Sequence, residues 1–280
     1  MLFRHAKKKT IRRKSSASVA EEYWKRYRIR LKDAEAVRGI ARAGQLVVQT
    51  LEMAAGHIRP GVSTKELNTL VHEFTLTHGA VPAPLDYHGF PKSVCVSVNN
   101  EVCHGIPGPR QLAEGDIVNI DVTSILDGWF ADANRTFLVG KTDPEAERLV
   151  DVTRQCLALG ISAVRPGATL GDVGHAIQTH AENAGFSVVR ELVGHGVGHA
   201  FHEQPQVPHT GRPGQGIVLV PGMVFTIEPM INAGGWPTKR LDDGWTVVTA
   251  NGSLSAQFEQ TVLITNKDIR SLTTDRKSVV

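Results

Sequence analysis

The segment LAEGDIVNID, residues 112–121, returns 107 positions later as LVPGMVFTIE, residues 219–228. A second pair, RPGVS at residues 59–63 and RPGAT at residues 165–169, is separated by almost the same interval, 106 positions. One chance Pro-Gly turn would explain a single short match. Two matches at nearly one offset instead predict that the chain is built from two duplicated α/β halves.

Apolar periodicity and turn residues divide each half into helices followed by strands. The expected helices cover residues 30–58, 64–78, 144–164 and 170–184. The expected strands cover residues 93–98, 116–123, 130–139, 187–190, 223–231, 245–249 and 258–265. The second helix of each half ends at a glycine, Gly79 or Gly185, again 106 positions apart. The element order therefore agrees with the repeat.

The repeat places two acids, Asp121 and Glu228, at equivalent positions in segments that otherwise read as buried strands. An ionised carboxylate is costly to bury unless it is paired or bound to a metal. A structural salt bridge would explain either acid alone. If the halves pack about a pseudo-twofold axis, however, both carboxylates converge on the cleft between them.

Three further residues extend this candidate site. Asp132 follows Asp121 by eleven positions across a turn-like segment, Glu259 precedes an apolar strand, and His195 lies between two glycines. Four carboxylates in one cleft repel each other unless cations are present. An oxygen-rich set with one imidazole suits Mn(II), Fe(II), Co(II) or Zn(II). Because five ligands exceed the need of one ion that also binds water, we predict two bridged metals and a hydrolytic reaction.

Composition sets the expected compartment. The chain has 280 residues, 41% of them hydrophobic, and only three cysteines, which fits a reducing environment. No run of about 18 apolar residues is present, so no membrane-spanning helix and no membrane contact are expected. We therefore predict a cytoplasmic protein. An organelle transit peptide stays open, because the Arg- and Ser-rich start also fits one.

Seven motifs carry a resemblance to a known family. They are YHGFPKSVC (87–95), CHGIP (103–107), NIDVT (119–123), GHG (194–196), FHE (201–203), FTIEPM (225–230) and SAQFE (255–259). In this order and spacing the chain resembles the methionine aminopeptidases of the bacterial type (type I), in peptidase family M24. The resemblance implies the pita-bread fold, of α/β (α+β) class, in which two pseudo-symmetric halves surround a central antiparallel sheet with flanking helices.

The resemblance also implies an activity and a metal centre. The expected reaction is hydrolysis of the peptide bond after the initiator methionine of nascent proteins with a small second residue, by a dinuclear metal-activated hydroxide. The cofactors would be two divalent ions (Co, Mn, Fe, Zn or Ni). Their ligands would be Asp121, Asp132, His195, Glu228 and Glu259. Within this set, Asp132 and Glu259 would bridge the ions.

Three residues would be catalytic by the same resemblance. Glu228 would shuttle protons and His202 would hydrogen-bond the substrate carbonyl. His104 would contact the scissile nitrogen. His104 and His202 also count among the substrate-binding residues, with an apolar methionine pocket made of Tyr87, Phe90, Cys95, Phe201 and Trp245. Two positions depart from the pattern, since Phe90 stands where Tyr is frequent and Pro84 where the bacterial enzymes often carry Cys.

The ends of the chain are expected to lie outside the catalytic domain. Residues 1–30 hold eleven Lys/Arg against two Glu, whereas the remainder is acidic overall. We predict a basic, disordered extension (1–27), one domain (28–270) with pseudo-repeats at about 28–143 and 144–270, and a C-terminal tail (271–280). The extension is either a solvated tail or an anchor on the phosphates of ribosomal RNA.

The same residues are also compatible with two other functions, an Xaa-Pro peptidase and a non-enzymatic binding module. An Xaa-Pro peptidase would use the same metal ligands, but such enzymes generally carry a substantial extra N-terminal domain, and the CHGIP motif favours the methionine enzyme. A non-enzymatic binding module on this fold would be expected to lack metal ligands, and all five positions are filled here. The expected assembly is a monomer acting on N-terminal Met-peptides.

Overall fold

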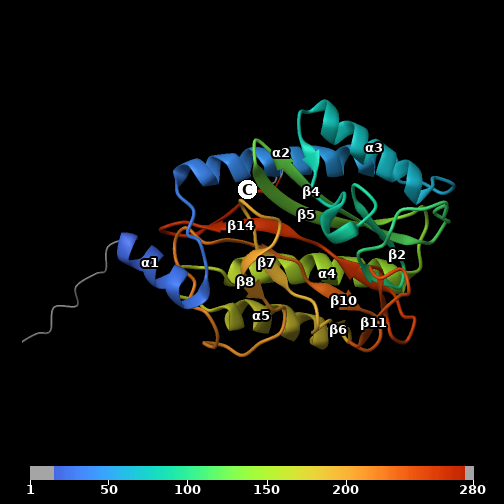
Figure 1. Ribbon diagram of the computed structural model, residues 1–280. Coiled ribbons are helices and arrows are strands. Elements are labelled where there is room, and N and C mark those ends of the chain that lie inside the picture. The colour runs from blue at the N-terminus through green and yellow to red at the C-terminus, as the bar shows by residue number, and fades with distance from the viewer. Residues whose placement is uncertain (1–15, 275–280) are drawn as a thin grey trace, which may run out of the picture.

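The computed structural model describes residues 16–274. Two helix pairs enclose the strands, with α2 and α3 above and α4 and α5 below in the view of Figure 1. The helices are α1 Ser16–Tyr27, α2 Ala34–Ala55, α3 Thr64–Thr77, α4 Pro144–Ala163 and α5 Leu170–Asn183, and a short 3-10 helix η1 covers Tyr87–Gly89. Apart from α1 and η1, which were not expected, they match the expected helices to within a few residues.

The strands pair antiparallel, and all except β4 and β5 are short. In chain order they are β1 Val81–Pro82, β2 Cys95–Val98, β3 Glu101–Cys103, β4 Ile117–Leu126, β5 Trp129–Leu138, β6 Ser187–Val188, β7 Gly194–Gly196, β8 Glu203–Val207, β9 Val224–Ile227, β10 Met230–Asn232, β11 Thr238–Arg240, β12 Val247–Thr249, β13 Ser255–Gln257, β14 Gln260–Ile264 and β15 Ile269–Ser271. One sheet has the order β1-β4-β2 with β5 paired to β4, and another has the order β15-β14-β9-β7-β8. Two three-stranded sheets, β13-β10-β6 and β11-β12-β3, complete the fold.

The structure confirms the repeat by matching hydrogen bonds in the two halves. Gly61 N–H donates to the Leu112 carbonyl (2.7 Å), and Gly167 N–H donates to the Leu219 carbonyl (2.9 Å). Both glycines have a φ of +89°, a conformation that side chains with a Cβ rarely adopt. The same Pro-Gly turn therefore joins the same two segments twice, and the sequence match reflects a duplicated local structure.

The helices that follow these turns start in the same way. Ser63 caps α3 and forms a reciprocal capping box with Glu66. Thr169 caps α5 and forms the same box with Asp172. Each box satisfies backbone N–H groups that a helix start leaves without partners. This explains why both helices begin at the residue predicted from the sequence.

Each half has its own apolar core. In the first half, α2 buries Ile40, Val47 and Leu51 against the β4–β5 pair. In the second half, Leu149 of α4 and Ile177 of α5 pack in a separate cluster. A fully buried side chain of this size contributes roughly 1.5–3 kcal/mol. The site between the halves is thus supported by two cores.

The expectation of a disordered segment through residue 27 is wrong for residues 16–27, which form α1. Tyr23 is buried, and its hydroxyl donates to the Val218 carbonyl at 2.8 Å. Val19, Tyr23 and Tyr27 recur at a spacing of four and pack on the second core, a helical stripe that the high charge of the segment obscured. Residues 1–15 lie outside the described part of the chain.

Two boundaries near the C-terminal end also differ from expectation. The predicted strand at residues 223–231 is split into β9 and β10, because Pro229 between them has no N–H to donate to a ladder. The predicted tail does not begin at residue 271, since β15 pairs with β14 and Leu272 is buried beside α2. Across residues 16–274, no helix combines the length and apolar character needed to cross a membrane.

Replacing Gly44 by Ala tests this close contact between α2 and the chain end. A Cβ at position 44 would lie 2.2 Å from the Leu272 carbonyl oxygen. We expect a loss of about 1–3 kcal/mol in the free energy of unfolding, although Ala favours a helix by about 1 kcal/mol over Gly. Urea denaturation measures it. The control is Gly108→Ala, whose Cβ would meet nothing closer than 3.9 Å. An unchanged or raised stability of Gly44→Ala would contradict the packing.

Candidate active site

Two of the candidate acids lie on one face of the β4–β5 pair. In the antiparallel register Asp121 stands opposite Asn134, and Thr123 stands opposite Asp132. Side chains two residues apart on a strand point to the same side, and directly opposite residues share a face. All four polar side chains therefore point toward the same side of the sheet.

The other acids lie at the end of the β9–β14 pair. Glu228 directly follows β9 and Glu259 directly precedes β14, and the terminal residues Ile227 and Gln260 are paired. Glu259 N–H donates to the Asn134 carbonyl of β5 at 3.1 Å. This bond joins the two halves. The acids predicted from opposite ends of the repeat are thus brought to one place.

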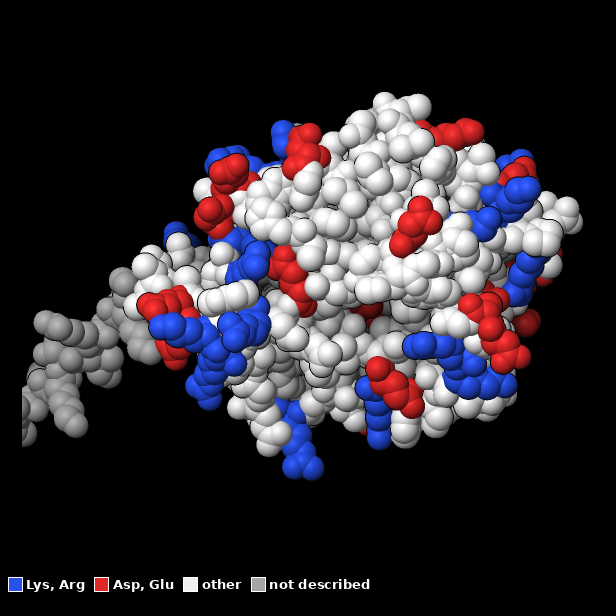
Figure 2. Space-filling model, in the orientation of Figure 1, with Lys and Arg blue, Asp and Glu red and all other residues white. Residues whose placement is uncertain are grey.

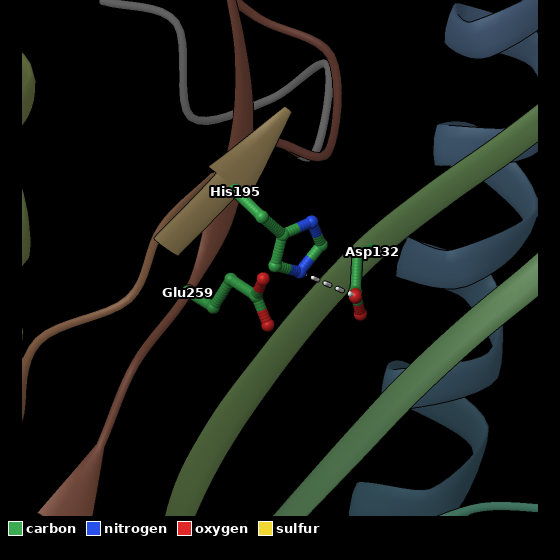
Figure 3. Close-up of side chains that lie close together, drawn as sticks. All are labelled: Asp132, His195 and Glu259. Atoms are coloured by element: carbon green, nitrogen blue, oxygen red, sulfur yellow. Dashed lines mark ion pairs between the residues drawn. The ribbon is translucent and has the colours of Figure 1, made fainter. Parts of the chain in front are cut away.

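Figure 3 shows Asp132, His195 and Glu259 pointing toward one another from β5, β7 and the segment before β14. One ligand atom from each lies within 4.8 Å of the other two. His195 Nε2 is 3.6 Å from Asp132 Oδ2 and 3.7 Å from Glu228 Oε1. Asp121 lines the same cavity, and its charge helps to raise the pKa of Asp132. The structure therefore gathers all five predicted ligand side chains, although the tight triad itself contains three of them.

Burial controls the protonation of these acids. It raises the pKa of Asp121 to about 7 and that of Glu228 to about 8. Burial, followed by the charges of the neighbouring carboxylates, holds the pKa of Asp132 and Glu259 well above the usual range. Within residues 16–274, no lysine or arginine forms an ion pair with any of the four. Without added cations, the cluster is expected to retain protons near neutral pH.

His195 is prepared to act as a neutral ligand. Its Nδ1–H donates to the Gly196 carbonyl at 3.0 Å, which leaves the Nε2 lone pair facing the acids. Burial lowers the pKa of the ring to about 3. The imidazole is therefore uncharged at neutral pH, as metal ligation requires.

Two carboxylate oxygens test whether the cluster fits a cation. Asp121 Oδ1 and Glu259 Oε1 are buried and have no hydrogen-bond partner in the described structure. The other oxygen of Glu259 accepts from Asn134 Nδ2 at 2.8 Å. Thr123 Oγ1 similarly donates to Asp132 Oδ1 at 2.8 Å. Carboxylates that are oriented by one oxygen and unpartnered at the other suit a divalent ion, so the residues fit a metal centre.

The cluster forms the floor of a cavity of about 270 Å³. All seven predicted substrate-binding residues line it: Tyr87, Phe90, Cys95, His104, Phe201, His202 and Trp245. The other lining residues are the five predicted metal ligands with Pro84, Cys103, Thr123, Glu191, Leu192, Val193, Met230 and Gln257. The structure thus brings every predicted site residue to one cavity, while their chemical roles stay predictions.

Aromatic rings shape the two walls of the cavity. On one wall Tyr87 packs on Phe201 with ring centroids 4.8 Å apart, and its hydroxyl lies 2.8 Å from His202 Nδ1. On the other, Phe90 meets Trp245 edge-to-face at 5.2 Å. Such walls suit a flexible apolar side chain. The missing hydroxyl at Phe90 leaves this second wall without a polar group at that position.

Several residues around the site were not predicted as site residues. Thr226 Oγ1 donates to Glu228 Oε1 at 2.7 Å, and Gln257 Nε2 donates to Glu228 Oε2 at 3.2 Å. Each lies two positions from a predicted ligand, on the same strand or at its end. Residues two apart on a strand point to the same face, so this spacing from a predicted ligand could have identified Thr226 and Gln257. The same spacing applies to Thr123 and Asn134.

The comparisons with known proteins agree with this site. Residues 38–266 match metallopeptidase family M24. Methionine aminopeptidase A of Synechocystis sp. is 54% identical over 238 residues, which is 85% of this chain and 94% of that protein. The crystal structure of methionine aminopeptidase from Rickettsia prowazekii has a TM-score of 0.87 and 48% identity, and the match covers 88% of this chain and 100% of that chain.

A more distant structure shares the fold alone. Prolidase from Pyrococcus furiosus has a TM-score of 0.70 at 20% identity, with 93% of this chain and 68% of that chain covered. The expected pita-bread architecture, of mixed α and antiparallel β composition, is therefore confirmed. Both the matched residues and the high-identity relatives extend over most of the chain. The protein thus belongs to metallopeptidase family M24, in the bacterial-type branch formed by methionine aminopeptidases.

Proposed function

We propose that the protein is a methionine aminopeptidase that removes the initiator methionine of nascent polypeptides when the second residue is small. One observation carries the proposal: three buried carboxylates, the partly buried Asp121 and a neutral imidazole line a cavity that also contains aromatic rings. Relatives that are 47% and 54% identical to this chain bear this name, which supports the same reaction class.

Two divalent metal ions, of Co, Mn, Fe, Zn or Ni, are the proposed cofactors. Asp121, Asp132, His195, Glu228 and Glu259 would hold them, with Asp132 and Glu259 shared between both ions. When bound, such a pair supplies an activated water and polarises the peptide carbonyl. Two observations support this. Asp121 and Glu259 each have a buried oxygen without a hydrogen-bond partner, and within residues 16–274 no Lys or Arg pairs with the four acids.

The remaining chemistry is assigned to three side chains. Glu228 would accept the proton of the attacking water and pass it to the leaving nitrogen, a role open to a carboxylate that lines the cavity. His202 would stabilise the developing oxyanion. Its pKa is lowered to about 4 by loss of water around the ring and then by His104, and with Nδ1 bonded to Tyr87 its Nε2–H remains free to donate. His104 would contact the scissile nitrogen.

Replacing Asp132 by Asn tests the centre directly. The amide keeps the shape of the side chain but removes a charge that both ions would share. We expect kcat/KM for Met-Ala-Ser to fall more than about 100-fold, with less metal retained after dialysis. Methionine release with Mn(II) or Co(II) is measured on protein shown to be folded. The matched control is Asp127→Asn, an exposed acid in the turn of the same hairpin.

Three outcomes of this assay are informative. Unchanged activity of Asp132→Asn would remove the proposed bridging role. Cleavage of Gly-Pro in place of Met-Ala-Ser by the unmodified protein would point to an Xaa-Pro peptidase. No hydrolysis of either peptide with any metal would favour a binding module.

The stabilising effect of metal should depend on pH. In the metal-free protein the pKa values of the four acids are raised, to about 7 for Asp121 and about 8 for Glu228, so the native state binds more protons than the unfolded state. Their contribution to stability is therefore present at low pH and lost as the pH rises through these values. Metal binds the deprotonated acids, so the rise in Tm on adding Mn(II) should be larger at about pH 8 than at about pH 6.

Differential scanning calorimetry with and without metal measures this difference. Calorimetric titration in buffers of different ionisation enthalpy should show proton release on metal binding. The ring of His195 adds little to this effect, because its pKa of about 3 leaves it neutral throughout the range. A Tm increment that is constant or shrinks with rising pH would contradict the assignment.

We also propose that the enzyme is a cytoplasmic monomer that meets nascent chains through its basic N-terminal region. Figure 2 shows Lys and Arg side chains gathered beside α1, where Arg28 and Arg30 both lie over the Trp24 ring at about 5 Å. Seven further Lys/Arg lie in residues 1–15. Cationic and aromatic groups together suit RNA phosphates and bases.

Deleting residues 1–15 and replacing Lys25 and Arg30 by Gln should weaken co-sedimentation with ribosomes, most clearly at low salt, and leave Met-Ala-Ser hydrolysis unchanged. The control replaces two exposed cations elsewhere, Arg154 and Lys267, by Gln. Equal, salt-insensitive co-sedimentation of all variants would leave the basic region as a solvated segment.

A further inference from the structure

A buried ion pair joins two segments that are far apart in the sequence. Lys32, between α1 and α2, places its Nζ 2.5 Å from Oε2 of Glu203, the first residue of β8. Their side chains are only 3% and 13% exposed. Removing two charges from water offsets most of their attraction, so such a pair adds little net stability. The ion pair is therefore more important for the position of the groups around it than for the stability of the fold.

The second oxygen of Glu203 holds the loop between β7 and β8. Glu203 Oε1 accepts the N–H of His199 at 2.8 Å and the N–H of Ala200 at 3.2 Å. The carboxylate thus receives the ammonium on one oxygen and two loop amides on the other. Because both oxygens are used, the position of the loop depends on the position of Lys32.

The loop is shaped to admit the lysine. A Cβ at Gly198 would lie 2.7 Å from both Cε and Nζ of Lys32, so a side chain at position 198 would block this path. On its other side the Gly198 carbonyl accepts the N–H of Phe130 in β5 at 2.8 Å. Gly198 is therefore held between the lysine stem and the central sheet.

The backbone around Lys32 is itself fixed. Its N–H donates to the Gly222 carbonyl at 2.7 Å, and Ile29 nearby is buried in the second core. We call residues Ile29–Asp33 the strap. Because the strap is anchored at both points, the Lys32 ammonium has a fixed position from which it can orient Glu203.

His202 is the residue that this arrangement controls. It precedes Glu203 directly and lies on the open side of the cavity, with its ring centroid 4.2 Å from that of His195. Its one side-chain hydrogen bond in the described structure is to Tyr87, which lies in η1. The ring also stacks on Phe201 of the same loop with centroids 4.4 Å apart, so the position of the loop backbone helps to set the position of the ring.

We propose that Lys32 is a positioning residue for catalysis: through Glu203 it fixes the loop that presents His202 to the substrate carbonyl. The inference rests on the proposed aminopeptidase function. A contribution to oxyanion stabilisation requires a donor placed to within fractions of an ångström. Loosening the loop is thus expected to lower kcat with little change in substrate affinity.

Lys32→Met tests this role, because Met keeps the apolar stem and removes the charge. We expect kcat for Met-Ala-Ser to fall about 10–100-fold and KM to change less than about twofold, with metal content unchanged. The matched control is Arg42→Met, which removes the cation of an exposed long-range pair with Asp127 and should leave kcat unchanged. Loss of bound metal, or a rise in KM alone, would overturn the proposal.

A double-mutant cycle separates positioning from general destabilisation. If Lys32 acts through His202, then Lys32→Met should cost less than about twofold in kcat when His202 is already Ala. An equal loss in both backgrounds would show that Lys32 acts elsewhere and would refute the proposal.

Hydrogen exchange provides a readout that does not depend on activity. In Lys32→Met, amides of residues 197–203 should exchange faster, while α2 and the β4–β5 pair keep their protection. If the unmodified protein releases no methionine but this protection depends on Lys32, the proposed function fails and the structural part of the inference survives. Unchanged exchange in the loop refutes the inference itself.

A second variant keeps the test valid if Lys32→Met folds poorly. Lys32→Met combined with Glu203→Gln leaves no unpaired buried charge, and the Gln oxygen can still accept the two loop amides. We expect this variant to regain stability and to retain a low kcat, because the link to the strap is absent. Recovery of full kcat would show that the link is dispensable.

Discussion

The structure depends on one electrostatic constraint, which is that four carboxylates share a cavity without a basic side chain to neutralise them within residues 16–274. Each buried charge costs several kcal/mol of desolvation, and the mutual repulsion adds to that cost. Such a cluster persists only where its surroundings hold the acids in place. Threonine hydroxyls and carboxamides donate to one oxygen of Asp132, to one oxygen of Glu259 and to both oxygens of Glu228, and each half adds its own apolar core.

Local chemistry made much of the fold predictable. Pro-Gly turns, capping residues and terminal glycines act within a few residues, so the starts and ends of α3 and α5 could be predicted from the sequence. The repeat then indicated that the two halves are built alike, because similar segments adopt similar local structures. The sequence does not predict α1, because its apolar stripe of Val19, Tyr23 and Tyr27 is embedded in a strongly basic segment of a kind that is typical of disorder.

Some residues of the candidate site could likewise be predicted from the sequence, and others could not. The acids could be found from sequence because a carboxylate in an apolar strand is anomalous by itself, whereas His104 and Tyr87 stood out only by resemblance. The contact between Lys32 and Glu203 spans 171 positions and follows no periodic pattern. Contacts of this kind depend on how the halves pack, which composition and spacing do not encode. The same holds for Asn119, which is buried and donates to Asn134, Thr136 and the Gln257 carbonyl behind the acids.

The two halves are not identical, and their differences make the two sides of the cavity chemically distinct. The repeat alone supplies paired acids, Asp121 and Glu228, and would make both sides of the cavity alike. At the strand position beside Asn119 the first half carries Ser97, whereas beside Thr226, the repeat equivalent of Asn119, the second half carries His195. The donor set is therefore richer in nitrogen on one side only.

The segments proposed to contact the substrate depart further from the repeat. The first half contributes η1 with Tyr87, and the second half contributes the loop that ends at His202, so the two meet across the cavity as unlike partners. In the proposed reaction, a peptide bound between them would have one orientation, with its carbonyl toward His202. Duplication thus accounts for the paired acids Asp121 and Glu228 in the cavity. The loops that differ between the two halves would determine which end of a bound peptide lies next to these carboxylates in the proposed reaction.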